Sequence, residues 1–136
     1  MSSFPSPDVS VAVLAGGAAR RLGGRKADRI LGSRRLVDYA IDLAEQVSRD
    51  VVFLPGSRQL EMPEGVHVRK KPDWAGGAGP LAGIVAGLND VQNRWCLVLS
   101  CDMPNLSLES LLPLFGPCEA TTADAVLWSR DGYVEP

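Results

Sequence analysis

Residues 9–17 read VSVAVLAGG, and this stretch decides the fold. Its first six residues are apolar or small and rich in valine, which is typical of a buried β-strand. The two glycines that follow predict a turn where the strand ends. We therefore expect a core strand from Val9 to Leu14 that leads directly into a glycine-rich loop.

The residues after this loop predict further strands and helices. Apolar residues recur every three or four positions between Leu36 and Val47, which indicates an amphipathic helix. Two apolar runs, Val51 to Leu54 and Val66 to Arg69, predict strands. A second helix is expected from Pro80 to Val91, because proline is tolerated in the first turn of a helix.

The last third of the chain contains one strong strand pattern and several weaker patterns. Residues 95–100 read WCLVLS, and this largely apolar run predicts a central strand. Ser107 is expected to cap a short helix that Pro113 ends. A final strand is expected from Ala123 to Trp128, followed by a turn at residues 131–132.

The alternation of strands and helices predicts an α/β fold with a doubly wound, mostly parallel, Rossmann-like sheet. We expect one domain over residues 1–136, because this length is too short for two separate cores. In such sheets, ligands bind beyond the carboxyl ends of the strands. The glycine-rich loop and Asp102 each follow a strand, so they are candidates for one site.

The composition excludes several classes of protein. The chain is 46% hydrophobic and 22% charged with a net charge of −2, which argues against a disordered or collagen-like chain. Its longest uncharged stretch, residues 74–89, contains Pro80 and is shorter than the roughly 20 apolar residues of a membrane span. No secretory signal is visible. We expect a cytoplasmic protein with reduced cysteines and no membrane partner.

A basic, glycine-rich segment predicts an anion site. Residues 20–35 hold seven of the fourteen basic residues and a single acid, and four glycines lie at positions 16–24. Glycines let backbone N–H groups approach phosphate oxygens, although a solvated basic face is the alternative interpretation. A P-loop is excluded because Ala27 follows Lys26 where serine or threonine is required. Nucleic-acid binding is not expected, since no aromatic residues interleave with the basic ones.

Three motifs stand in order along the chain: LAGGAARRLGGRK at residues 14–26, DWAGGAGPLAG at 73–83 and LVLSCDMP at 97–104. Together they resemble the molybdenum cofactor guanylyltransferase branch of the nucleotidyltransferase superfamily. The resemblance covers Val9 to Pro136. Because members of that family are longer, we expect this chain to be the N-terminal nucleotide-binding portion, truncated relative to the family. Arg25 is a departure, since an aspartate usually precedes the lysine of the first motif.

The resemblance implies a reaction and a set of roles. It implies that GMP is transferred from GTP to the phosphate of a molybdopterin acceptor, with release of pyrophosphate and with Mg²⁺ as the cofactor. Arg21 and Lys26 are implied as catalytic residues that stabilise the leaving pyrophosphate. Asp102 is implied as the Mg²⁺ ligand, and Asp73 as the residue that recognises guanine.

The nucleotide-binding residues implied by the resemblance are Leu14, Ala15, Gly16, Gly17, Lys26, Asp73 and Asp102. Two other hypotheses stay open. One is a transferase of the same superfamily that uses CTP or ATP with another phosphorylated acceptor. The other is a nucleotide-binding module without catalytic activity.

Overall fold

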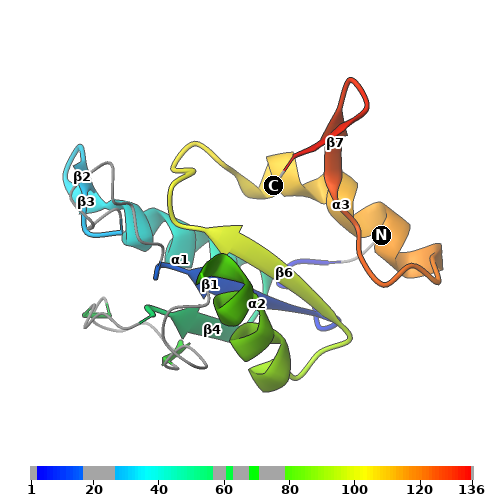
Figure 1. Cartoon of the computed structure of the whole chain (residues 1–136), viewed down its shortest axis with the longest axis horizontal. Helices are drawn as coiled ribbons and strands as arrows, with labels where there is room; N and C mark the ends of the chain where they lie inside the picture. The colour runs from blue at the N-terminus through cyan, green and yellow to red at the C-terminus, as the bar shows by residue number, and fades with distance from the viewer. Residues whose placement is uncertain (1–2, 17–26, 57–60, 63–67, 71–78, 136) are drawn as a thin grey trace. The chain divides into compact units, whose positions relative to one another are not determined.

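The fold is described from a computed structural model of the chain, which describes residues 3–16, 27–56, 61–62, 68–70 and 79–135 (Figure 1). These residues form two compact units that divide after Asn105. The first unit, residues 1–105, contains the main sheet and two helices. The second unit, residues 106–136, contains one helix and one hairpin.

Strand β1, Val9–Leu14, is at the centre of the first unit and confirms the strand expected there. Its first five residues are buried, since both faces of the strand are covered. It pairs in parallel with β4, Val51–Leu54, on one side and with β6, Trp95–Ser100, on the other. The stretch that opens with VSVAVL therefore supplies the central strand.

The main sheet has the strand order β5-β4-β1-β6, and all of its pairs are parallel. Strand β5 covers Arg69–Lys70, so only the last part of the expected strand is described, and residues 66 and 67 lie outside the described residues. We expected β6 to be a central strand, and this is wrong for the described sheet, where β6 lies at an edge. The other described strands beyond it, β7 and β8, pair with each other instead.

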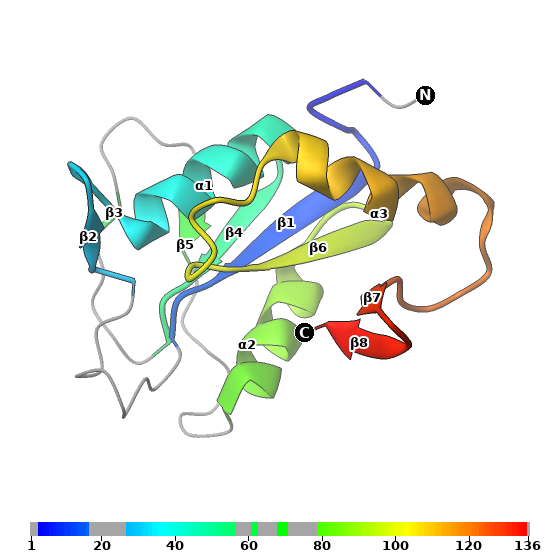
Figure 2. The ribbon, with the colours of Figure 1, turned by 90° about the horizontal axis from the view of Figure 1, so that it is seen from above.

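Helices α1, Leu36–Val47, and α2, Gly79–Asp90, lie on opposite faces of the sheet (Figure 2). Both helices were expected, and α2 begins and ends one residue earlier than expected. A parallel sheet with helices on both faces is the doubly wound α/β arrangement, so the predicted fold class is confirmed. None of the described helices is long and apolar enough to cross a membrane.

Helix α1 buries one face against the sheet. Most of the buried residues belong to the expected apolar stripe, but Val37 and Ile41 are buried as well, while Leu36 and Tyr39 are only half-buried. The complete buried set is Val37, Ala40, Ile41, Leu43, Ala44 and Val47.

Helix α2 approaches the sheet unusually closely at Gly87. A Cβ atom at this position would lie 2.8 Å from the Cβ of Ala12 and 3.1 Å from Cδ1 of Leu54. Ala12 and Leu54 belong to a buried cluster with Val52, which helix α2 covers with Ala86. The glycine therefore allows the helix backbone to pack directly on β1 and β4.

A network of polar side chains joins the amino ends of the strands. The carboxylate of Asp50, just before β4, accepts hydrogen bonds from the Ser10 hydroxyl of β1 and, at 2.9 Å, from the Gln92 N–H before β6. Its other oxygen lies 2.7 Å from Nη2 of Arg69 in β5. Arg69 also donates to the carbonyl of Asp90 at the end of α2, at 2.9 Å. One carboxylate thus connects the amino ends of β1, β4, β5 and β6 and, through Arg69, the end of α2.

A small hairpin, not expected from the sequence, precedes α1. Strands β2, Ile30–Leu31, and β3, Arg34–Arg35, pair in an antiparallel way around Gly32 and Ser33. Gly32 has a φ of +67°, a conformation that favours glycine. The hydroxyl of Tyr39 in α1 donates to the Leu31 carbonyl at 2.9 Å, which ties the hairpin to the helix.

In the second unit, helix α3 covers Leu108–Ala120. The hydroxyl of Ser107 accepts a hydrogen bond from the N–H of Ser110 at 3.2 Å, so the expected cap is confirmed. Pro113 was expected to end the helix, and this is wrong, because the helix continues through Pro113 and Pro117. Each proline removes one backbone donor, but the N–H groups of the residues between and after them remain available to continue the helix.

The second unit ends in a hairpin of β7, Trp128–Arg130, and β8, Tyr133–Glu135. Asp131 and Gly132 form the expected turn with φ values of 51° and 82°, which suits a tight hairpin. The expected strand from Ala123 to Trp128 is wrong except for its last residue. The ladder of this hairpin stops at the pair Trp128–Glu135, so residues 123–127 have no hairpin partner in the described structure.

Candidate functional site

The strand order places a switch point between β1 and β6. From β1 the chain passes through α1 to β4 on one side, and later passes through α2 to β6 on the other side. In open α/β sheets, ligands bind beyond the carboxyl ends of the strands at such a reversal. Leu14 is the last residue of β1 and is followed by Ala15 and Gly16, and Asp102 lies two residues after the end of β6.

Backbone hydrogen bonds hold these two strand ends side by side. Leu14 is aligned with Ser100, and the N–H of Cys101 donates to the Leu14 carbonyl at 3.3 Å. On the other side, the N–H of Ala15 donates to the Leu54 carbonyl at 3.0 Å. Leu14, buried Ala15 and half-exposed Gly16 thus begin the loop at a fixed position, directly beside the segment that carries Asp102.

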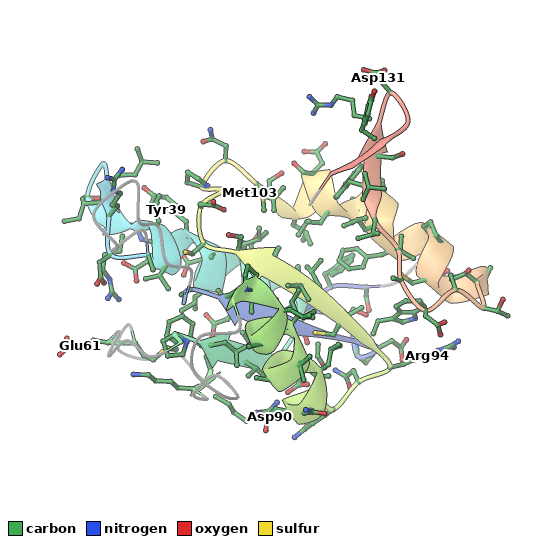
Figure 3. The ribbon with its side chains drawn as sticks, in the orientation of Figure 1. Tyr39, Glu61, Asp90, Arg94, Met103 and Asp131 are labelled. Atoms are coloured by element: carbon green, nitrogen blue, oxygen red, sulfur yellow. The ribbon has the colours of Figure 1, made fainter. Side chains whose placement is uncertain are left out.

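Asp102 is exposed and accepts a hydrogen bond from the Ser100 hydroxyl at 2.6 Å. Cys101, which lies between them in the chain, is buried and holds the backbone in place. Arg94 and Met103 lie at opposite ends of β6, so Asp102 lies at the end of the strand away from the Asp50 network (Figure 3). The carboxylate and the hydroxyl are hard oxygen groups of the kind that Mg²⁺ prefers.

The chain that follows the first motif is anchored to the start of α1. Ala27, the residue after Lys26, is buried, and its carbonyl accepts a hydrogen bond from the N–H of Val37 at 3.0 Å. The Arg29 carbonyl accepts from the N–H of Leu36 at 2.8 Å. The described residues on either side of positions 17–26, Ala15 before them and Ala27 after them, are therefore held by backbone hydrogen bonds.

Two arginines of the basic segment are neutralised within the protein. Arg34 lies 2.6 Å from Asp42 and its guanidinium stacks over Tyr39 at 5.1 Å from the ring centre. Arg35 lies 2.9 Å from Asp38. Hydrogen bonds to these carboxylates raise the pKa of both guanidinium groups. The expectation that the basic segment binds an anion therefore does not extend to these two residues.

Four of the predicted site residues, Gly17, Arg21, Lys26 and Asp73, lie outside the described residues. The described site residues Leu14, Ala15, Gly16 and Asp102 lie at the paired carboxyl ends of β1 and β6. Ser100 was not predicted as a site residue, although a serine two residues before an aspartate in an extended segment projects from the same face as the aspartate.

The three cysteines are free thiols, as expected. Burial raises the pKa of the Cys96 thiol to about 11. Within the part of the chain that the structure describes, no group of three or more His, Cys, Asp or Glu residues could hold a metal ion.

A family model of the MobA-like NTP transferase domain matches residues 11–136. The chain belongs to this family. It is similar to curated proteins over most of its length. The probable molybdenum cofactor guanylyltransferase of Methanocaldococcus jannaschii is 30% identical over 91% of this chain and 66% of the relative. The molybdenum cofactor guanylyltransferase of Aliivibrio salmonicida is 33% identical over 91% of this chain and 63% of the relative. This MobA-like chain therefore spans about two thirds of their length.

Solved structures of low sequence identity share the fold of this MobA-like domain. A 2-C-methyl-D-erythritol 4-phosphate cytidylyltransferase from Thermus thermophilus has a TM-score of 0.65 at 18% identity, covering 95% of this chain and 63% of that one. A Mycobacterium tuberculosis protein has a TM-score of 0.63 at 19% identity, covering 89% of this chain and 63% of that one. These similarities support the Rossmann-like nucleotidyltransferase fold.

Proposed function

We propose that this chain is a nucleotidyltransferase that transfers GMP from GTP to the phosphate of a molybdopterin-type acceptor in molybdenum cofactor biosynthesis. The observation that carries the proposal is the position of Asp102 just after β6, where the end of β6 is paired with the end of β1 at the switch point of the sheet. Membership of the MobA-like family and the names of the curated relatives support the choice of reaction.

The first motif is proposed to bind the triphosphate. Backbone N–H groups of Gly16 and Gly17 contact the β- and γ-phosphates, and Leu14 and Ala15 fix the start of this loop. A glycine backbone lets oxyanions approach without obstruction from a Cβ atom. Lys26 then supplies a positive charge, and its neighbour Ala27 is buried against the start of α1. Arg21 supplies a second charge from within the same loop.

Asp102 is proposed to hold Mg²⁺ together with the phosphates. A single carboxylate suits this ion, which keeps most of its waters and is usually bound through one or two carboxylates and phosphate oxygens. When bound, Mg²⁺ supplies charge neutralisation to the polyphosphate. The protein contributes a carboxylate that accepts a hydrogen bond from Ser100, next to Cys101, whose N–H is bonded to β1.

The chemistry needs positioning and charge stabilisation, with no general base. The acceptor phosphate attacks the α-phosphorus of GTP in line, its oxygen forms the new P–O bond, and pyrophosphate leaves as the bond to the α-phosphorus breaks. A phosphate monoester has a second pKa near 6, so the nucleophile is already largely ionised at neutral pH. Arg21 and Lys26 stabilise the negative charge that develops on the pyrophosphate. Asp73 is proposed to accept two hydrogen bonds from guanine.

A titration with each of the four nucleoside triphosphates, with and without Mg²⁺, tests the proposal. We expect GTP to raise the melting temperature most and Mg²⁺ to strengthen its binding. Asp102→Asn should lose the Mg²⁺-dependent part of the rise in melting temperature with GTP. Asp124 is an exposed acid of the second unit, and Asp124→Asn should behave like the wild type. Pyrophosphate release with GTP and molybdopterin then tests the transfer.

Each other outcome corresponds to one of the open hypotheses. A preference for CTP or ATP would replace the proposal with a transferase for another phosphorylated acceptor. Binding of GTP without pyrophosphate release would favour a nucleotide-binding module. Failure of all four nucleotides to bind would refute the proposed site.

A further inference from the structure

Ser100 and Asp102 form a side-chain pair at the carboxyl end of β6. The distance from Ser100 Oγ to Asp102 Oδ1 is 2.6 Å, within the range of a charge-assisted O–H···O⁻ hydrogen bond. Residues two apart in an extended segment project from the same face, which allows this contact. The residues that alternate with them, Leu99 and Cys101, are buried. The buried pair fixes the backbone while the polar pair faces solvent.

The pair is also held against the start of the proposed nucleotide loop. Ser100 is the last residue of β6 and is aligned with Leu14, the last residue of β1. The N–H of Cys101, between the two polar residues, donates to the Leu14 carbonyl. Movement of the Ser100–Asp102 segment relative to the loop would therefore break backbone contacts of the sheet.

We propose that Ser100 is a positioning residue that orients the Asp102 carboxylate toward a divalent cation bound to the nucleotide. The inference rests on the proposed function, because it requires that Asp102 holds the cation. An ionised carboxylate has about four lone-pair sites, so it can accept the serine hydrogen bond and bind a cation as well. An exposed aspartate has several accessible rotamers, and the hydrogen bond selects one of them.

The size of the effect can be taken from comparable sites. Removal of a group that orients a metal ligand typically lowers metal affinity by about 10- to 100-fold. Ser100 is exposed, and water can partly replace its hydroxyl, so we expect the lower end, about 10-fold. The contribution of Ser100 should therefore be visible in metal-dependent binding and absent from metal-independent binding.

The experiment measures the Kd of GTP for the full chain in EDTA and in saturating Mg²⁺. The Kd in EDTA divided by the Kd in Mg²⁺ gives the gain in affinity due to the cation, and this ratio is compared between the wild type and each variant. Ser100→Ala is expected to reduce this ratio about 10-fold while leaving the Kd in EDTA and the melting temperature without nucleotide unchanged. Ser100→Thr keeps the hydroxyl and should retain most of the ratio. Ser129→Ala, which removes an exposed strand hydroxyl of the second unit, is the matched control and should equal the wild type.

The outcomes separate the two proposals. If Asp102→Asn abolishes the Mg²⁺ effect and Ser100→Ala retains the full wild-type ratio, the positioning role of Ser100 is refuted while the function of Asp102 stands. If the wild type binds GTP equally well with and without Mg²⁺, both are refuted. If Ser100→Ala weakens binding equally in EDTA and in Mg²⁺, the hydroxyl acts on the nucleotide or the fold, which also overturns the positioning role.

Discussion

Gly87→Ala tests the packing of α2 on the sheet, which sets the position of this helix relative to β1 and β4. The new methyl group would lie 2.8 Å from the Cβ of Ala12 and 3.1 Å from Cδ1 of Leu54. The first contact cannot be relieved by a side-chain rotation, because the Cβ of Ala12 is fixed to the backbone of the central strand. Leu54 is only 1% exposed and has little space to move into. The helix itself therefore has to shift outward.

The expected loss of stability follows from two opposing effects. Overpacking of a core typically costs about 1–3 kcal/mol, and the rigid contact with Ala12 places this site in the upper half of that range. Alanine is favoured over glycine in a helix by about 1 kcal/mol, which offsets part of the loss. We therefore expect the free energy of unfolding to fall by about 1–2 kcal/mol and the melting temperature by about 4–8 °C.

Urea unfolding followed by circular dichroism measures this change, with thermal unfolding as a second readout. Gly116→Ala in α3 is the matched control, because an added Cβ there would meet no atom within 4 Å. Its stability should change by less than about 0.5 kcal/mol, since Pro117 follows it and limits the gain in helix propensity. A Gly87→Ala protein as stable as the wild type, with the same dependence on urea, would refute the close contact.

Four further predictions concern the network, the thiols and the proposed site. Asp50→Ala should lower the free energy of unfolding by about 2 kcal/mol in urea titrations. Breaking a fully buried ion pair would cost more than this, but Arg69 is 36% exposed and solvent screens its charge. Because burial raises the pKa of Cys96 from 9.0 to about 11, its neutral thiol contributes to stability fully below pH 9.0, and this contribution is lost as the pH rises through about 11. The urea midpoint of the wild type should therefore fall more steeply than that of Cys96→Val over this interval, and parallel curves would contradict this. Lys26→Ala should slow pyrophosphate release by about 10²-fold, and a rate within twofold of the wild type would rule out its catalytic role. Asp73→Ala should reduce the preference for GTP over ATP in competition assays, whereas an unchanged preference would assign base recognition elsewhere.

The elements that the sequence predicted well are those whose hydrophobic pattern agrees with their final environment. Strand β1 is apolar and buried on both faces, and α1 has an apolar stripe that faces the sheet. Their boundaries were predicted to the residue. Helix α2 was also expected, because Pro80 marks its first turn.

The elements that the sequence did not predict depend on pairing. The β2–β3 hairpin is only two residues long on each side, and the Gly32-Ser33 turn was its one available signal. The segment over residues 123–127 has a strand-like composition, yet the Asp131-Gly132 turn sets a ladder that ends at Trp128. The edge position of β6 could not be read from WCLVLS, because an apolar run does not specify how many neighbours a strand has.

The adjacency within the candidate site was predictable, whereas its fine geometry was not. Parallel strands end at the same edge of a sheet, so the proximity of Asp102 to residues 14–16 followed from the fold class. The contact between Ser100 and Asp102 depends on side-chain rotamers, and the pairing of Arg34 and Arg35 with acids of α1 depends on the unpredicted hairpin.

The side-chain network around Asp50 and Arg69 has a consequence for how such a domain diversifies. It stabilises the strand order at the amino ends of the strands, whereas the residues proposed to bind substrate lie at the opposite, carboxyl ends. Loops at the reactive edge can then gain, lose or exchange residues while the scaffold stays intact. One framework can in this way accommodate new acceptors by altering its loops alone.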